Sequence, residues 1–416
     1  MYSRLRDSFL DGLSSYYGSD VMPAGASVNM RRALAEHRNR LRDKGLTYKE
    51  TYINTIDDRP GETPAGSETF NISHCYKHCN VIAEYSDGSN TVKLDESPDD
   101  IVYVQVIDLK DRESADQILV CPNCGHRSVA RDFADGCPMC STKFKISEIY
   151  PSVNSYYSIP WPMPKKDFPE QAMKVAKWIG IGGGLLIGLI ALIGMLMTKS
   201  STWVTALISI VVALVSGWGL FILSYLISMA VFSGKAVSGA ARLAADTLDM
   251  AGAQNSQRQT EQAVCQFDKN FNYRVFEGQI LSAIRSIAYS SDRQNCSVYT
   301  GTGDLSFMDD LVDIRYRGAC RFEKAVAADG YLHVIMTAFL DNIYYREGSF
   351  SKARERFTVE MVRRQEVQTV PDISAHSINC GSCGASFDAV ISRKCPYCGT
   401  PYALADHDWS VILIAR

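Results

Sequence analysis

Eight of the thirteen cysteines in this chain of 416 residues stand in pairs separated by two residues. Two such pairs form a first group with twelve residues between the pairs, and the other two form a second group with eleven. Two intervening residues let one tight turn point both sulfurs at one ion, and a second turn of this kind completes a tetrahedron. The predicted metal ligands are Cys121, Cys124, Cys137 and Cys140 in the first group and Cys380, Cys383, Cys395 and Cys398 in the second.

Both groups have the spacing of zinc ribbons, in which four thiolates fill every position around the ion. A closed tetrahedron leaves no position for a substrate, so we expect two structural Zn2+ ions as the cofactors. Gly125, Gly384 and Gly399 each follow a cysteine directly, and glycine supplies the backbone freedom that such a turn needs. The two groups are therefore expected to stabilise the fold.

Three other interpretations of the cysteine pairs fit less well. Cys395-Pro396-Tyr397-Cys398 matches the active-site string of glutaredoxins, but a second pair lies at ribbon distance and the surrounding strand and helix pattern is missing. A RING domain needs eight interleaved ligands in one short segment, whereas the two groups lie about 240 residues apart. The net charge is only −3, and acidic residues offset the basic ones near the first group, so nucleic acid is not an expected partner.

The segment His74-Cys75-Tyr76-Lys77-His78-Cys79 suggests a third metal site. Its cysteines are four residues apart, which is not a ribbon turn, and alternation along a strand places Cys75 and Cys79 on one face. We expect core thiols here, with a metal site as the alternative. Three isolated cysteines are expected to be small core residues: Cys265, Cys296 and Cys320.

Two apolar stretches in the middle of the chain, 178–197 and 203–232, contain no charged residue and no histidine. At 1.5 Å per residue the first spans about 30 Å, one hydrocarbon core, and the second is long enough to span with tilt. The sequence therefore predicts a two-helix transmembrane hairpin over 178–232. Because ion paths usually contain ionisable groups within the membrane, these spans are expected to be an anchor.

Charge around the spans predicts their orientation. Basic residues flank the hairpin at Lys165, Lys166, Lys174, Lys177, Lys235 and Arg242, whereas the connecting turn has only Lys199. By the positive-inside rule both termini are cytoplasmic, and we expect an integral protein of the bacterial plasma membrane. The charged start of the chain and the paired thiols agree with a reducing compartment.

Stripes of small residues recur every four positions in both spans: Gly180, Gly184 and Gly188 in the first, and Ser209, Ala213 and Gly217 in the second. Small residues let helix backbones approach closely. We expect the two stripes to face each other within one hairpin. Pairing between protomers, which would make a homo-oligomer, stays open, as does a role as the accessory subunit of a transporter.

The region before the spans divides into two parts. Residues 1–56 are expected to be a helical segment, and a polar linker leads into a β-rich domain over 70–150 that contains the first ribbon, 121–140. The basic stretch 31–44 fits either lipid contact or a solvated helix. Tyr156, Tyr157 and Trp161 fit either an aromatic belt at the membrane surface or a stiff linker.

The region after the spans begins with an Ala-rich linker or helix over 233–263. Apolar residues spaced along one face predict a helix from about 270 to 289. Alternation of apolar and charged residues then predicts strands over 312–323, 332–344, 356–367 and 409–415, with Asp329-Gly330 as a hairpin turn. The predicted class is α+β, with a helix laid across a long antiparallel sheet.

Three motifs mark this region: Phe267-Asp268-Lys269-Asn270-Phe271 before the long helix, a strand ending Val362-Arg363-Arg364, and a final strand opening Asp408-Trp409. With this order of parts, residues 265–416 resemble the Tim-forty-four-like family. The resemblance implies an α+β cone similar to nuclear transport factor two, with the second ribbon, 380–398, inserted between the last two strands. Mitochondrial members are membrane-bound scaffolds for a protein-import motor, but the hairpin, the first domain and both ribbons depart from them, so motor binding does not carry over.

We therefore expect a membrane-anchored zinc-binding scaffold or adaptor that presents cytoplasmic domains to protein partners. The alternative is a module at the membrane surface that binds a lipid or small molecule, or an enzyme, in the pocket of the cone; a buried carboxylate-histidine pair would favour it. Tyr316, His333, Asp341 and Arg356 form no convincing pair of nucleophile and base. No catalytic residue is assigned, and no enzyme is expected.

Overall fold

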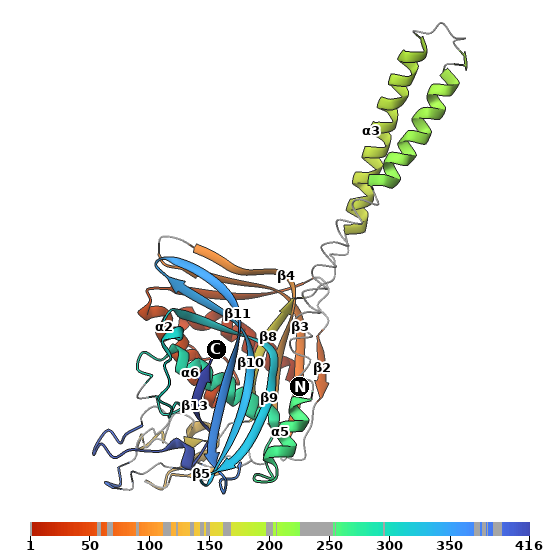
Figure 1. The fold of residues 1–416 in the computed structure, drawn as a ribbon. Coiled ribbons are helices and arrows are strands. Elements are labelled where there is room, and N and C mark those ends of the chain that lie inside the picture. Colours follow the sequence, from red (N-terminus) through yellow and green to blue (C-terminus); the bar gives the residue numbers. More distant parts are fainter. Residues whose placement is uncertain are drawn as a thin grey trace. The chain divides into compact units, whose positions relative to one another are not determined.

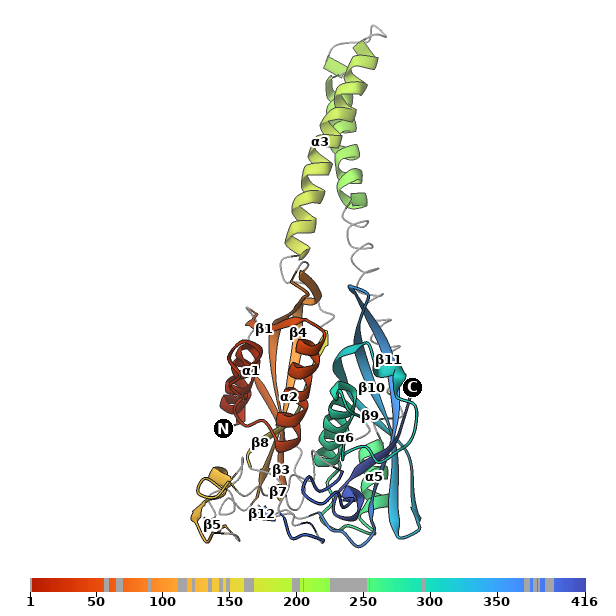
Figure 2. The ribbon, with the colours of Figure 1, turned by 90° about the vertical axis from the view of Figure 1, so that its left-hand side faces the viewer.

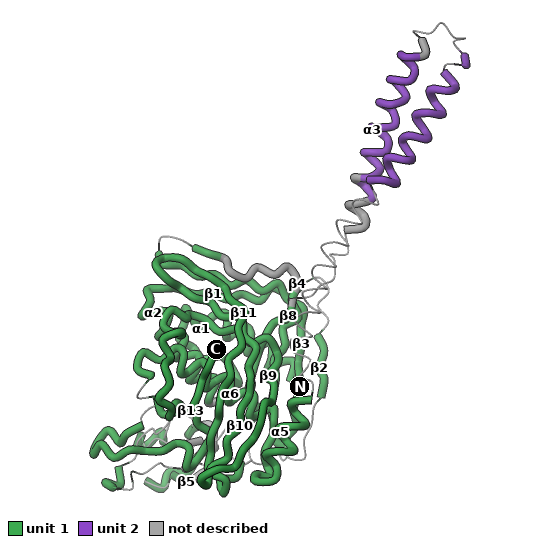
Figure 3. The backbone as a smooth tube through the Cα atoms, viewed as in Figure 1, with its two compact units in different colours: residues 1–161, 250–416 green, residues 162–249 purple. Residues whose placement is uncertain are grey.

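The computed structural model describes residues 2–55, 60–64, 70–88, 91–110, 118–121, 124–133, 137–141, 145–146, 150–160, 168–196, 203–204, 206–224, 253, 255–293, 296–369, 375–376, 380, 382–385 and 393–416. They form two compact units (Figure 3). The larger unit combines residues 1–161 with 250–416, and the smaller contains 162–249. Most of the expected linker 233–263 lies outside the described residues.

The smaller unit contains two apolar helices, α3 (Phe168–Leu196) and a second helix, Ala206–Ser224. Both are long and apolar enough to cross a membrane. A Cβ on Gly180 would lie 2.7 Å from Phe221 Cβ, and a Cβ on Gly188 would lie 2.5 Å from Ala213 Cβ. The contacts therefore run in opposite directions along the two helices, and only glycine permits this approach. The expectation that the small-residue stripes face each other within one chain is confirmed.

The larger unit is α+β and consists of two halves, residues 2–160 and 255–416 (Figures 1 and 2). The first half contains α1 (Tyr2–Ser19), α2 (Val28–Asp43), β1 (Thr47–Asn54), β2 (Gly61–Pro64), β3 (Phe70–Ser86), β4 (Thr91–Leu109) and β8 (Ser152–Pro160). Its antiparallel sheet has the order β1-β3-β4-β8, and β2 pairs with β3. Among the described residues four short elements precede β8: β5 (Ile118–Val120), β6 (Arg127–Val129), a 3-10 turn, Ala130–Phe133, and β7 (Lys145–Ile146).

Two expectations for the first half were wrong. The helical segment expected over 1–56 ends at Asp43, because Gly45 adopts a positive φ of 68°, and Thr47–Asn54 is a strand. Its Thr, Tyr and Ile residues favour extended backbone. The stretch expected to approach the membrane as a belt or linker is instead strand β8, which pairs along β4. Tyr156 and Tyr157 belong to this sheet, and Trp161 lies outside the described residues.

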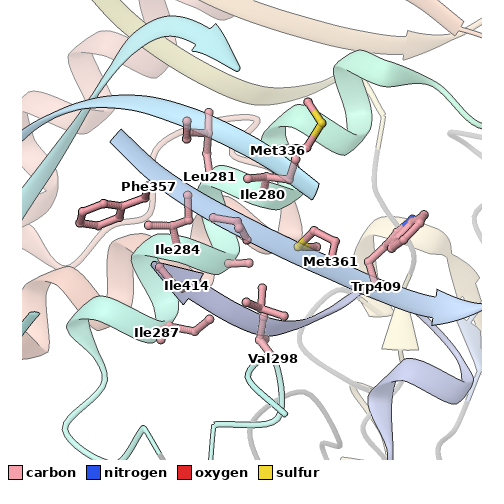
Figure 4. Close-up of a cluster of buried hydrophobic side chains, with 14 of the residues drawn as sticks. Ile280, Leu281, Ile284, Ile287, Val298, Met336, Phe357, Met361, Trp409 and Ile414 are labelled. Atoms are coloured by element: carbon pink, nitrogen blue, oxygen red, sulfur yellow. The ribbon is translucent and has the colours of Figure 1, made fainter. Parts of the chain in front are cut away.

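The second half contains α5 (Ser256–Val264), α6 (Tyr273–Tyr289), β9 (Leu311–Ala328), β10 (Tyr331–Arg346), β11 (Ser349–Arg364) and β13 (Ser410–Ala415), with 3-10 turns at Ser306–Met308 and Leu404–Asp406. Its antiparallel sheet has the order β13-β11-β10-β9. Helix α6 begins at the N-cap Asn272 and packs its apolar face on this sheet, where Ile280 and Ile284 belong to one buried cluster with Phe357 (Figure 4). Asp329 and Gly330 both adopt positive φ, so the predicted hairpin turn is confirmed.

The two halves have the same order of elements. Among the described residues each has two α-helices, a meander of long strands, a four-cysteine group, and a last strand that pairs with the last long strand before that group. In both halves the last strand begins twelve residues after the last cysteine, at Ser152 and at Ser410. A β-bulge also interrupts both ladders at matching places, between Gln105 and Val106 and between Glu360 and Met361. The halves are therefore structural repeats, although the sequence indicated an inserted ribbon only in the second.

The halves contact each other through helices, strands and a short added ladder. Helix α2 packs against α6, and β8 lies beside β9. The two-residue strands β7 (Lys145–Ile146) and β12 (Ala375–His376), which flank the two cysteine groups, pair with each other. Side chains that line the space between the halves therefore come from both ends of the chain.

Candidate metal centres and the cavity between the halves

The structure brings the eight predicted cysteines together as two groups of four, and within each group all sulfurs lie within 4.8 Å of one another. In the first group Cys121 and Cys140 sulfurs are 3.7 Å apart. In the second, Cys383 and Cys395 sulfurs are 3.6 Å apart. A tetrahedral zinc ion with bonds of about 2.3 Å places its sulfurs about 3.8 Å apart, so both groups fit this ion.

Each cysteine pair sits on a turn closed by backbone hydrogen bonds. The N–H of Gly125 donates to the carbonyl of Cys121, and that of Gly399 donates to Cys395, both at 2.9 Å. The residue after each pair adopts a positive φ: Gly125 (72°), Ser141 (57°), Gly384 (70°) and Gly399 (75°). The three glycines predicted to allow these turns thus do so, and Ser141 is the exception among the four.

Backbone N–H groups of the turns favour the thiolate form that binds metals, whereas neighbouring thiols raise the pKa of Cys124 and Cys383 to about 12. Backbone N–H groups of Cys383 and then Ser382 donate toward Cys380 and lower the pKa of its thiol to about 6. In both groups the first cysteine of each pair is buried: Cys121, Cys137, Cys380 and Cys395. The ion would therefore lie against the body of each ribbon, with Cys124 and Cys383 on the solvent side.

The remaining cysteines belong to apolar cores. Cys75 and Cys79 are fully buried in the cluster formed by α1, α2 and the first sheet, as expected for core thiols. Burial raises the pKa of Cys75, which disfavours the thiolate. Cys320 is buried, and Cys265 and Cys296 pack at the edge of the second core.

A cavity of about 210 Å3 lies between the two halves. The first half lines it with five tyrosines and two acids: Tyr17, Tyr48, Tyr52, Tyr156, Tyr157, Glu50 and Asp100. The second half lines it with four basic side chains and two acids: Arg285, Arg315, Arg317, Lys352, Asp313 and Asp341. Burial raises the pKa of all five tyrosines, so their hydroxyls stay protonated.

A buried histidine and carboxylate meet beside this cavity. His37 Nε2 lies 2.9 Å from the carbonyl oxygen of Val312 and 3.7 Å from an Asp313 oxygen. A carbonyl only accepts, so Nε2 carries the proton, and Nδ1 accepts from the Tyr17 hydroxyl at 2.7 Å. Burial lowers the pKa of His37, which keeps the ring neutral. Both ring nitrogens are therefore occupied, and neither has a lone pair free for proton transfer.

Asp313 is held as an anion. Burial acts to raise its pKa, but the charge of Arg315 and the hydrogen bond from the Tyr85 hydroxyl lower it below the usual value. The Tyr85 hydroxyl donates to Asp313 at 2.5 Å, and Arg315 Nε lies 3.2 Å away. These contacts fasten the start of β9 to β3 of the other half.

The structure separates the four residues considered for catalysis. Tyr316 and Asp341 line the cavity. His333 Nδ1 instead pairs with Glu360 at 2.9 Å, and the Arg356 guanidinium lies over the Phe339 ring. Sequence reasoning missed the contributions of His37 and Glu50, which lie about 270 residues from their partners on β9. The one local signal was the charged alternation of β9, whose residues Asp313 and Arg315 face the other half and not solvent.

No family model, curated protein or solved structure matches this chain. The resemblance to the Tim-forty-four-like family therefore stays a prediction.

Proposed function

We propose that this protein is a zinc-binding scaffold, anchored by a two-helix transmembrane hairpin, that presents its ribbons to a protein partner. The two stretches of chain on either side of the apolar helices form one compact unit, so both stretches must lie on the same side of a membrane. Two spans satisfy this requirement. The flanking lysines and arginines favour the cytoplasmic side of a bacterial plasma membrane.

The outward faces of the two helices support membrane insertion. Leu185 is 67% exposed and Leu214 is 68% exposed, and an exposed apolar face of this size suits lipid. The larger unit buries its apolar side chains in its own core and therefore does not need lipid around it. A long helix across a four-stranded antiparallel sheet supports the cone fold in the second half, and the first half combines two helices with a five-stranded antiparallel sheet.

Exposed apolar side chains on the ribbons carry the adaptor proposal. Met139 and Tyr397 occupy the same position in the second cysteine pair of their groups, and they are 71% and 73% exposed. On β5, directly before the first ribbon, Ile118 and Val120 are also exposed. A zinc-closed turn holds such a side chain rigidly, which lowers the entropy lost when a partner binds it. The ribbons therefore suit protein contact.

Catalysis is not part of this proposal. The buried His37–Asp313 pair is the arrangement that would favour an enzyme, but both nitrogens of His37 are already engaged. Among the described residues lining the cavity, no other histidine and no cysteine is present. Histidine or cysteine catalysis is therefore not assigned to the cavity.

The test is crosslinked affinity purification of the full chain from its native membranes, followed by mass spectrometry. A double variant, Met139→Ser with Tyr397→Ser, should lose a reproducible protein partner while keeping two zinc ions per chain. Val326→Ser is the matched control, because Val326 is 45% exposed on β9 outside the ribbons. Recovery of the wild-type chain without a protein partner, or equal recovery with the double variant, would contradict the proposal.

A further inference from the structure

We propose that the cavity between the two halves binds a small zwitterion, a molecule that carries an ammonium group and a carboxylate or phosphate on one short skeleton. This site is separate from the ribbons and from their exposed side chains. The inference therefore goes beyond the scaffold role and does not depend on it.

The two walls of the cavity carry opposite charge. On the first half, Glu50 and Asp100 stand with five tyrosines and no Lys or Arg. On the second half, four basic side chains outnumber the acids Asp313 and Asp341. Neutral His37 adds no charge to this count, and burial raises the pKa of Glu50, an effect that the charge of Arg315 opposes. The formal charges of the lining side chains cancel over the whole cavity, but the negative charge lies on the first half and the excess of positive charge on the second. The electric field therefore points from the second half to the first.

A zwitterion matches this field because each of its charges meets the complementary wall. The ammonium group would face the carboxylates and the aromatic rings of the first half, which attract cations. The anionic group would face Arg315, Arg317 and Lys352 of the second half. A ligand with a single charge would leave one wall uncompensated in a largely buried site, which is unfavourable.

Two of the ion pairs at the cavity are spaced to admit such a ligand, whereas Arg315 with Asp313 and Lys352 with Asp341 close to 3.2 Å. Arg315 and Glu50 approach only to 3.8 Å, as do Arg317 and Asp341, beyond ordinary hydrogen-bond distance. By contrast, the buried pair of Arg363 with Asp268, away from the cavity, closes to 2.7 Å. Asp341 Oδ1 is buried and accepts no hydrogen bond from any residue that the structure describes. The two longer pairs, Arg315 with Glu50 and Arg317 with Asp341, hold charge at the cavity without closing it.

The volume limits the ligand to a compact molecule. About 210 Å3 suits an amino acid or the polar head of a phospholipid but not an acyl chain. An amino acid and a phospholipid head group both carry the ammonium and the anionic group that the walls recognise. Phosphoethanolamine stands for the head group and L-alanine for the amino acid, so the two probes distinguish these ligands.

The experiment is isothermal titration of the full chain in an uncharged detergent. Four probes are added at up to about 10 mM: phosphoethanolamine, L-alanine, ethanolamine and inorganic phosphate. We expect at least one zwitterion to bind about tenfold or more tightly than either singly charged probe, since each charged contact contributes about that factor. Tighter binding of phosphoethanolamine assigns a lipid head group, and tighter binding of L-alanine assigns an amino acid. If neither zwitterion binds, or if ethanolamine or phosphate binds as tightly, the proposal is wrong.

Variants on opposite walls test the orientation. Asp100→Asn on the first half should weaken binding of the zwitterion about tenfold, and Lys352→Gln on the second half should do the same. Asp310→Asn is the matched control, because Asp310 pairs with Arg346 and does not line the cavity. Each variant must keep two zinc ions per chain. Tyr52→Phe, which removes one hydroxyl and keeps the ring, replaces any variant that fails to fold and should also weaken binding. Unchanged affinity in the folded wall variants would overturn the proposal.

Discussion

The two halves of the larger unit share one order of elements but line their common cavity with different chemistry. The first half supplies five tyrosines, two acids and the neutral His37, whereas the arginines and the lysine among the described lining residues come from the second half. Matching bulges and matching cysteine groups show that the backbone plan is the same in both. The repeated order of helices and strands therefore determines the fold. The side chains that differ between the two repeats determine the charge and polarity of the cavity.

Removing one metal group at a time gives the largest effect on this comparison. Cys124→Ser or Cys383→Ser should each reduce zinc from two ions to one per chain and unfold the ribbon concerned. Structural zinc sites of this kind contribute about 10–16 kcal/mol of binding free energy that is coupled to folding. Metal analysis and limited proteolysis measure the outcome. A variant that keeps both ions would show that the mutated thiol is not a ligand, and a third ion in the wild type would revive a site at Cys75 and Cys79.

Core substitutions test whether the repeats unfold separately. Leu13→Ala in the first core and Ile284→Ala in the second each truncate a fully buried side chain. Each should lower the free energy of unfolding by about 2–5 kcal/mol. Because the halves share an interface, we expect both variants to shift one common transition in denaturant. Ile53→Ala is the control at an exposed apolar position. Two transitions, each moved by only one variant, would mean that the halves are independent domains.

His37 connects the halves and makes stability depend on pH. Burial lowers its pKa in the folded chain below the usual value of about 6.5, so the unfolded chain binds the proton more readily. Its contribution to stability is thus present above pH of about 6.5 and is lost as the pH falls below that value. His37→Gln should cost about 1–3 kcal/mol at pH 8 and should flatten the dependence of Tm on pH between 8 and 5. An unchanged slope in this variant would argue against a neutral, buried ring.

The smallest expected effect concerns the one ribbon turn that lacks glycine. Ser141 adopts a φ of 57°, whereas Gly399 occupies the corresponding position in the second half. Ser141→Gly should stabilise the first ribbon by about 0.4–1 kcal/mol, and Gly399→Ser should destabilise the second by a similar amount. Thermal unfolding followed by zinc release measures both. If Ser141→Gly lowered the stability, or Gly399→Ser raised it, the two turns would not be equivalent.

The sequence predicted the parts of the molecule that depend on local spacing. The cysteine groups, the apolar helices, α6 and the β9–β10 turn all follow from patterns a few residues long. The repeat and the cavity did not follow, because they depend on pairing across about 260 residues. The charged residues that alternate with apolar ones on β9 fitted a face exposed to solvent. In the structure the first half covers that face at Asp313 and Arg315. Likewise Tyr156 and Tyr157 fitted a membrane surface, but β8 places them in the cavity wall.

Expression of residues 1–161 and 250–416 as two separate chains tests most directly the claim that both ends of the protein build one unit. Without the apolar helices to connect them, the chains should still copurify as a one-to-one complex with two zinc ions. His37→Ala with Arg315→Ala, which removes contacts between the halves, should weaken that complex. Two folded monomers that do not associate would contradict the shared unit, the cavity between its halves, and the placement of both flanks on one side of the membrane.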